Sequence, residues 1–200
     1  MAELNAIIPQ QNFELVRVRI GQILALEIAN QFTLHNDAKL NATVFDDIAI
    51  PVDISYCPAI VVSYSRTDFD NQDVRNTDGA NTYNIDVFVT AETTQAERGD
   101  IKAKRILYRL LGMCRAILEN PAYIRLGFSA PSIGNRRVES ILINQDAQSG
   151  DAKTVAHGRI VFNVRVPEDV QLKDATDWAG TDTIMTIEET DIGYKYTLNA

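Results

Sequence analysis

The sequence predicts an α+β fold in two layers: a mainly antiparallel sheet packed against an N-terminal helix and one long central helix. Three observations carry this prediction: a helical pattern near the N-terminus, a longer helical pattern in the middle, and alternating apolar residues in several other segments. The chain has 200 residues, 46% of them hydrophobic, which is enough for one substantial core. We therefore expect one domain over residues 1–167 and a C-terminal extension, with a β-hairpin, over 168–200.

The first helix is expected from Phe13 to Gln31, with Asn12 as its N-cap and Glu14 near the positive end of the helix dipole. With about 100° of rotation per residue, its apolar residues fall on two nearly opposite sides. One side suits a sheet beneath the helix. The other side, the apolar strip, consists of Leu15, Val18 and Leu26. Because one sheet cannot cover both sides, another subunit or the C-terminal extension is expected to cover this strip.

Short β-favouring runs follow the helix. Strands are expected at 42–50 and at 59–65, the second beginning after Pro58, which cannot donate a hydrogen bond to a ladder. The polar segment 66–81 is expected to be a long hairpin loop that is mobile when the subunit is alone. Its return strand is expected at 82–90, where apolar and polar residues alternate, so that one face is core and the other is mixed.

A long helix is expected to start at Thr93 or Thr94 and to end at Glu119, before Asn120 and Pro121. Its length would be about 27 residues, or roughly 40 Å. Apolar residues fill one broad arc of this helix. The opposite side has few acids and carries the cations Arg98, Lys102, Lys104, Arg105, Arg109 and Arg115.

Two further strands are expected at 137–144 and 156–166, joined by a turn at 146–153. In the second strand, strict alternation separates two faces. The first holds Ile160, Phe162, Val164 and Val166, and the second holds His157, Arg159, Val161 and Arg165. The last segment, "TIMTIEETDIGYKYTL", predicts a terminal hairpin that turns near 191–193.

Composition excludes several classes of function. The net charge is -8, which disfavours general binding to nucleic acid, because affinity for phosphates comes mainly from Lys and Arg. The sequence has no apolar run of about 18 residues and no N-terminal signal pattern, so a soluble protein made in a cytoplasm and without a membrane partner is expected. Cys57 and Cys114 lie in apolar sequence and are expected to be buried free thiols.

No motif predicts a catalytic, cofactor-binding or metal-binding residue. The acidic run that begins at Asp68 lacks the Gly and Glu that an EF-hand needs at positions 73 and 79. His35 and His157 are isolated and are expected to be surface or hydrogen-bonded histidines. The most nuclease-like fragment consists of Asp86, Glu97, Asp100 and Lys102. Since three of these four residues are expected on the surface of a helix, a metal-dependent nuclease remains only an alternative.

The cations of the long helix are the remaining candidate site. A rigid row of cations on an acidic protein suits an acidic partner surface, which includes a second copy of the same chain. A merely solvated helix face is the simpler alternative, and nucleic-acid binding would need more exposed aromatic residues than Tyr108. The candidate interface residues are Arg98, Lys102, Arg105, Arg109, Arg115, Leu15, Val18 and Leu26.

The order of these elements resembles that of the tail terminator, or tail completion, proteins of long-tailed bacteriophages. The segments that carry the resemblance are "ELVRVRIGQILALEIANQ", "CPAIVVSYS", "TYNIDVFVTAE", "LLGMCRAILENP" and "GRIVFNVRVPED", and together they span about residues 12–168. The resemblance implies a two-layer subunit that assembles into a six-membered ring. Such a ring caps the growing tail tube, and the sheath where one exists, and joins the tail to the head connector.

The resemblance also implies partners and a location. The partners would be other copies of the chain in a homo-hexamer, the tail tube and sheath proteins, the head–tail connector proteins, and genomic DNA that passes through the channel without specific binding. The location would be the virion neck, after assembly in the host cytoplasm. No cofactor is implied, and the chain is not expected to be an enzyme. Another head–tail connector, neck or baseplate protein is the nearest alternative.

Overall fold

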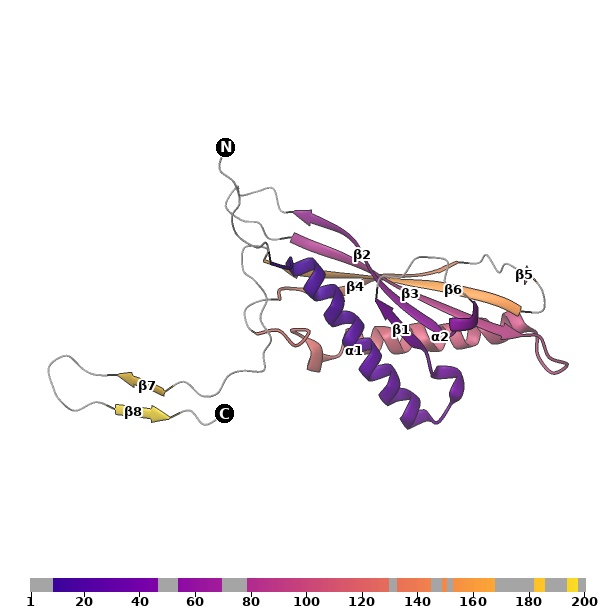
Figure 1. Cartoon of the computed structure of the whole chain (residues 1–200), viewed down its shortest axis with the longest axis horizontal. Helices are drawn as coiled ribbons and strands as arrows, with labels where there is room; N and C mark the ends of the chain where they lie inside the picture. Colours follow the sequence, from indigo (N-terminus) through magenta and orange to yellow (C-terminus); the bar gives the residue numbers. More distant parts are fainter. Residues whose placement is uncertain are drawn as a thin grey trace.

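A mixed sheet and two helices form the body of the fold in the computed structural model (Figure 1). The structure describes residues 9–46, 54–69, 79–129, 133–144, 149–150, 153–167, 182–185 and 194–197. The helices are α1 (Asn12–His35) and α2 (Gly99–Leu118), with short 3-10 helices η1 (Ala38–Leu40), η2 (Ile54–Tyr56) and η3 (Pro121–Tyr123). The strands are β1 (Thr43–Asp46), β2 (Ala59–Phe69), β3 (Gly79–Glu92), β4 (Arg136–Asn144), β5 (Ser149–Gly150), β6 (Lys153–Val166), β7 (Asp182–Met185) and β8 (Tyr194–Thr197).

The main sheet has the strand order β1-β2-β3-β6-β4, and β5 also pairs with β6. Only β1 and β2 run parallel; the other neighbours are antiparallel. The predicted α+β class with a mainly antiparallel sheet is therefore confirmed. β7 and β8 form a separate two-stranded antiparallel sheet, which is the terminal hairpin that the sequence predicts.

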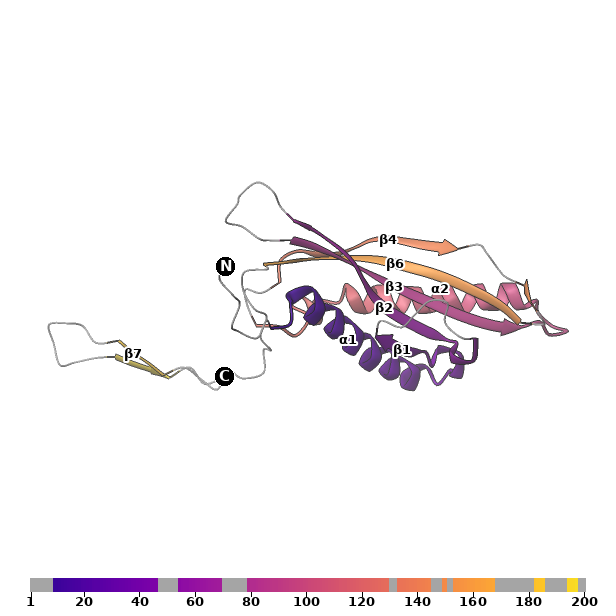
Figure 2. The same cartoon turned by 45° about the horizontal axis from the view of Figure 1, so that its top comes forward.

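Both helices lie on the same face of the sheet (Figure 2). α2 contacts β3 and β6, whereas α1 contacts β1, β2 and α2. The core lies between the two layers, because the apolar positions of β3 and β6 alternate toward the helices. Its largest fully buried side chains are Tyr83, Phe162, Ile20, Leu24, Ile28, Ile60, Ile85, Leu107, Leu110, Leu118, Leu126 and Ile160.

The other face of the sheet is covered by neither α1 nor α2 (Figures 1 and 2). It carries a small apolar cluster of Ala59, Val61 and Phe88, with Phe45 and Cys57 packed against it. Beside this cluster β3 and β6 present polar residues, including Asp86 and Arg159, which lie opposite each other in the register. The mixed face that the alternation predicts is therefore present.

The start of α1 differs from the prediction that Asn12 is the N-cap. Gln11 takes the N-cap position, and its carbonyl accepts hydrogen bonds from the amides of Glu14 and Leu15 at 3.0 and 3.2 Å. Asn12 is buried instead, and its Nδ2 donates to the Pro167 carbonyl at 2.6 Å. This partner is distant in sequence, so local cap preferences cannot reveal it. The bond fixes the end of β6 beside the start of α1.

α1 also runs further than Gln31, to His35. Asn36 ends it with a left-handed φ of 48°, and its amide donates to the Phe32 carbonyl at 2.9 Å. Asn accepts this conformation more readily than most residues. The extra turn adds Leu34 and His35 to the helix, and both prove relevant to the surface described below.

α2 begins at Gly99, so the predicted start at Thr93 or Thr94 is wrong. Thr94 Oγ1 accepts from the Glu97 amide at 3.2 Å, and Thr93 Oγ1 accepts from the Gly99 amide at 3.1 Å. The two threonines therefore build a turn ahead of the helix. The helix has 20 residues, or about 30 Å, and its far end is held by Arg136, which donates to the Leu118 and Asn120 carbonyls.

The predicted loop at 66–81 is shorter than expected. β2 extends to Phe69 and β3 starts at Gly79, with a regular register from Arg66↔Thr82 to Phe69↔Gly79. The alternation of apolar residues does not reveal these strand ends, because most of their side chains are polar. The ladder still forms there, since its hydrogen bonds join backbone groups. The remainder of the loop, with the acidic residues 70, 73 and 78, lies outside the described residues, as does the 47–50 part of the first predicted strand.

The two cysteines differ in burial. Cys114 is buried in the core, as predicted, and burial raises the pKa of its thiol to about 12. Cys57 is only half-buried, so the prediction of a buried thiol is wrong there. It lies beside the small apolar cluster on the face that the helices do not cover.

Candidate interaction surface and a buried polar network

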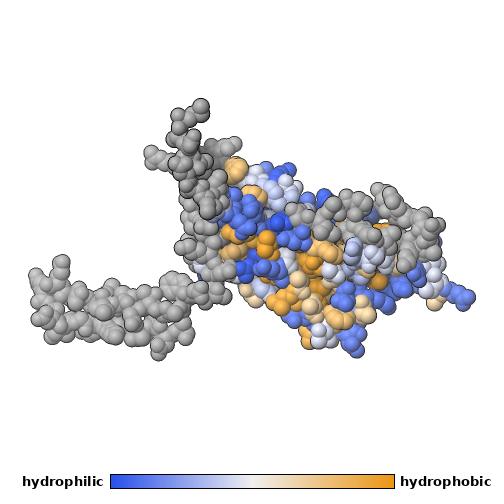
Figure 3. Space-filling view, in the orientation of Figure 1, coloured by the Kyte–Doolittle hydropathy of each residue, from blue (hydrophilic) through white to orange (hydrophobic). Residues whose placement is uncertain are grey.

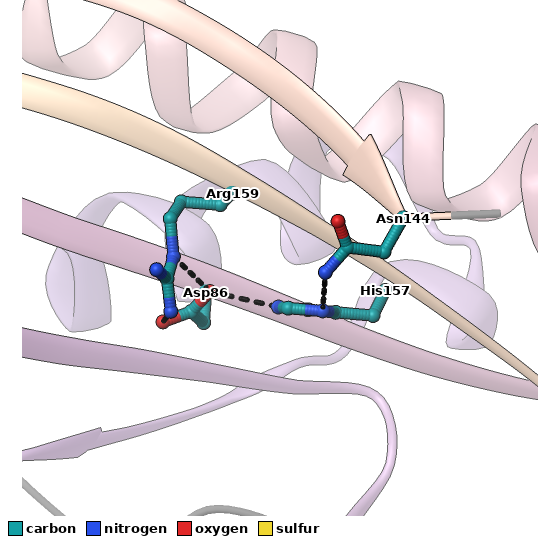
Figure 4. A network of polar contacts seen from close by, with 4 residues as sticks. All are labelled: Asp86, Asn144, His157 and Arg159. Carbon is teal, nitrogen blue, oxygen red and sulfur yellow. Dashed lines mark hydrogen bonds and ion pairs between the residues drawn. The ribbon is translucent and has the colours of Figure 1, made fainter. Parts of the chain in front are cut away.

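A polar network lies on the middle strands of the sheet, on the face away from the helices (Figure 4). Asp86 of β3 is fully buried and accepts hydrogen bonds from two residues of β6. Arg159 donates to both of its carboxylate oxygens, through Nε at 2.8 Å and Nη2 at 2.9 Å. His157 Nε2 lies 2.7 Å from Asp86 Oδ1. The network joins the two central strands through side chains as well as through the ladder.

His157 is held in one orientation from three sides. Because a carboxylate only accepts, Nε2 of His157 donates to Asp86, and Nδ1 then accepts from Asn144 Nδ2 at 2.8 Å. The ring also stacks on Phe88, with 4.4 Å between ring centroids and 4° between the planes. Both ring nitrogens are therefore hydrogen-bonded, and His157 links Asp86 of β3 to Asn144 of β4.

Charge and burial act on Asp86 in opposite directions. Burial alone would raise the pKa of Asp86, but the hydrogen bonds from His157 and Arg159 and the charge of Arg159 outweigh it and hold the pKa below the usual 3.8. The same hydrogen bond raises the pKa of Arg159 above its usual range. Asp86 and Arg159 thus remain a charged pair, because the hydrogen-bond donors around the buried carboxylate stabilise its ionised form.

The structure separates the residues of the nuclease-like fragment. Asp86 is paired with Arg159 and His157, whereas Glu97 pairs with Arg105 at 2.9 Å and Asp100 pairs with Arg98 at 3.0 Å. Each carboxylate therefore has its own cation, and the three do not converge on one cleft. Within the part of the chain that the structure describes, no group of three or more His, Cys, Asp or Glu side chains could hold a metal ion.

The cations of α2 lie along the outer side of the helix layer. Several have local acidic partners: Arg98 with Asp100, Arg105 with Glu97, and Arg115 with Glu119 at 3.0 Å. Such exposed pairs contribute little to stability, because water screens the charges. Their positions match the prediction of a basic helix side, and their role at an interface stays a prediction.

Three other cations of this surface lack such partners. Among the residues that the structure describes, no acid pairs with Lys102, Lys104 or Arg109. Arg109 Nη2 lies instead 3.0 Å from His35 Nε2, across the contact between the two helices. This positive charge stays uncompensated within the described chain.

Two hollows open next to these cations. One, of about 290 Å³, is lined by the charged residues Lys39, Glu92 and Lys102, together with Pro58, Thr90, Ala91 and Ile106. The other, of about 360 Å³, is lined by the polar residues His35, Asp37, Lys39, Arg105 and Arg109 and by the apolar residues Leu40 and Ile106. The two hollows share Lys39 and Ile106. We call the Lys, Arg and His residues that line them the basic groove: His35, Lys39, Lys102, Arg105 and Arg109.

The apolar strip of α1 is divided by the structure. Leu15 packs against the main core and Val18 is half-buried, so these two residues are covered in part by this chain itself. Leu26 is 58% exposed, and Leu34, which the shorter predicted helix left out, is 77% exposed. Figure 3 shows apolar residues gathered where α1 lies in Figure 1. Leu26 is thus the exposed residue of the strip. Leu34 adds a second exposed leucine near the end of α1, about 80° around the helix from Leu26. We refer to these two exposed leucines together as the open part of the apolar strip.

The sequence contains partial signals for what the prediction missed. Asp86 lies in one alternating strand, and His157 and Arg159 lie on the polar face of another. Because a buried acid needs hydrogen-bond partners, these two residues were candidates for pairing with it. Lys39, Leu34 and His35 fell outside the predicted helix, so no pattern linked them to Arg109. Only the contact between α1 and α2 brings them together.

Comparison with known proteins adds no identity to this geometry. No family model matches the sequence, and no curated protein matches it. Of the described residues, none belongs to a helix long and apolar enough to span a membrane.

Proposed function

We propose that this chain is a structural subunit that associates with copies of itself into a ring, which caps the tail tube of a long-tailed phage and joins the tail to the head connector. The observation that carries the self-association is the open part of the apolar strip, Leu26 and Leu34. A helix with apolar residues on two sides is normally buried on both. In this chain one of those sides meets the core, whereas the other is half-buried at Leu15 and Val18 and exposed at Leu26.

The choice of a tail terminator rests on the order of elements. The helix, the strand after Pro58, the strand followed by a long helix, and the two closing strands that carry the resemblance correspond to α1, β2, β3, α2, β4 and β6. Another head–tail connector or a baseplate protein shares ring assembly from small domains, and imaging of the protein within a particle separates these positions.

The arrangement of acids favours a structural role over a nuclease. Asp86, Glu97 and Asp100 are each neutralised by a different cation, whereas a metal-dependent nuclease needs carboxylates that converge on a metal. An assay for cleavage of plasmid DNA with divalent metal addresses this alternative. Cleavage that Asp86→Ala abolishes would overturn the structural role.

The experiment for the proposed position uses the tail tube protein of the same phage. Tubes polymerised with this chain are expected to carry a ring at one end and to stop growing, which electron microscopy would show as capped tubes with a shorter length distribution. Unchanged tube lengths together with bare ends would contradict the proposed capping function. Rings without capping would favour another neck or baseplate component.

A further inference from the structure

Charge is divided unevenly along this chain. Residues 168–200 contain eight acidic and two basic residues, a net charge of -6 out of the -8 of the whole chain. Residues 1–167 therefore carry only -2. Within them the span from Arg98 to Leu118 holds six cations and one acid. The C-terminal segment and the surface of α2 thus have opposite charges, although Glu97 and Glu119, which flank this span, pair with Arg105 and Arg115 and reduce the positive charge of that surface.

The basic groove has the chemistry to bind an acidic segment. Lys39 lies between the two hollows, with Lys102 on one side and Arg105 and Arg109 on the other. The walls at Ile106 and Leu40 are apolar, so carboxylates that enter meet cations in a partly desolvated place, where charge pairs are stronger than on an open surface. Lys102 and Arg109 have no acidic partner among the described residues.

The helices also expose apolar residues, and the C-terminal segment contains a separate two-stranded sheet. On α1, Leu26 and Leu34 are exposed, and on α2 so is Tyr108. The strands β7 and β8 of that segment hydrogen-bond only with each other in the sheets described. An isolated two-stranded hairpin is marginally stable in water and gains stability by packing against another element.

We propose that residues 168–200 of one copy dock on the basic groove and the open part of the apolar strip of a second copy. Acids of the segment, such as Asp174 and Asp177, pair with Lys102 and Arg109, and apolar residues such as Trp178 pack on Leu26 and Leu34. The segment leaves the body at Pro167, which Asn12 holds beside the start of α1. The inference rests on the proposed function only in that both require self-association, and it needs no phage tail.

Charge reversal tests this pairing. The groove variant carries Lys102→Glu and Arg109→Glu, and the tail variant carries Asp174→Lys and Asp177→Lys. Each variant alone is expected to raise the Kd of self-association at least tenfold, measured by analytical ultracentrifugation at low salt. An equimolar mixture of the two variants is expected to regain association, because each acidic segment then meets a basic groove and each reversed segment meets a reversed groove.

The mixture distinguishes a second copy from the chain's own segment. If the segment docks on its own chain, mixing cannot restore association and only the quadruple variant can, and that result overturns the proposal. The matched control carries Arg125→Glu and Arg137→Glu, which change the net charge by the same amount at exposed residues outside the groove. If the control loses as much self-association as the groove variant does, the proposal is also overturned, since net charge alone would then explain the weaker association.

A second measurement uses the unaltered protein. Chains labelled with ¹⁴N and ¹⁵N are mixed at low concentration, concentrated, and cross-linked with a carbodiimide, which joins a lysine directly to a carboxylate. Mixed-isotope links from Lys39 or Lys102 to an acid within 168–200 are expected. Same-isotope links only, or none to the groove, contradict the proposal. Rings that form without cross-links between the groove lysines and residues 168–200 would contradict this inference but leave the proposed function intact.

Discussion

At the scale of residues, the polar network around Asp86 shows how a charged group is kept inside this sheet. The carboxylate lies on the middle strand, fully buried, and accepts three hydrogen bonds from Arg159 and His157. The side chain of Arg159 is 35% exposed, so water solvates the guanidinium in part while the carboxylate is dry. Stability therefore depends on keeping both members of the pair.

Removal of the Asp86 carboxylate is predicted to destabilise the fold. Asp86→Ala should lower the free energy of unfolding by about 2 to 4 kcal/mol, less than for a wholly buried pair because water reaches Arg159. Urea denaturation measures the change. The control is Asp68→Ala, which removes an exposed pair with Arg66 and should cost less than about 1 kcal/mol. Equal effects of the two substitutions would show that the network adds no more stability than an exposed ion pair.

The depressed pKa of Asp86 predicts how its contribution depends on pH. The folded pKa lies below the 3.8 of the unfolded chain, so the stabilisation is fully present above the unfolded value and is lost as the pH falls through the folded value. The difference in unfolding free energy between the wild type and Asp86→Asn should stay constant above about pH 5 and shrink below pH 3.8. A difference that grows on acidification would contradict this.

At the scale of elements, most of the fold follows from local patterns. Alternation predicts β3 and β6 because their core-facing residues are β-branched or aromatic, and the apolar arc of α2 matches its buried residues. The predicted element boundaries are wrong where a residue distant in sequence, or a polar side chain, determines where the element begins or ends. Asn12 bonds Pro167, Thr93 caps from outside the helix, and polar residues extend β2.

The candidate site was only half predictable for the same reason. The cations of α2 can be read from one helix, whereas His35 and Lys39 join them only through the packing of α1 and η1 beside α2. The Asp86 network likewise needs the register of β3 with β6, which places Asp86 opposite Arg159. No periodicity within a single segment contains that information.

Two glycines in α2 give opposite predictions. A Cβ at Gly112 would meet nothing within 4 Å, so Gly112→Ala should raise the free energy of unfolding by about 0.5 to 1 kcal/mol through helix propensity. A Cβ at Gly99 would lie 2.8 Å from the Ala91 carbonyl oxygen, and Gly99→Ala should lower it by about 1 to 3 kcal/mol. Thermal unfolding monitored by circular dichroism ranks the two; the reverse order would contradict the position of the helix start.

At the scale of the whole molecule, charge limits what the proposed ring could bind. Six copies at -8 each give about -48 before ion binding, and an acidic or neutral bore would let DNA slide without sticking. The basic groove would then face neighbouring subunits. Filter binding at low salt should show no tight binding of double-stranded DNA by the assembled protein. Tight binding that weakens steeply with salt would place the cations in the bore.

The most direct test of the account is the mass of the assembled protein and its dependence on the open part of the apolar strip. Light scattering of the wild type should give a mass above the 22.3 kDa chain, about 134 kDa for six copies, and electron microscopy should show rings. Leu26→Glu with Leu34→Glu should leave the chain folded and monomeric, whereas Ile124→Glu, at an exposed residue outside the strip, should still assemble. A wild type of 22.3 kDa at every concentration, or a double variant that assembles like the wild type, would contradict association through this surface.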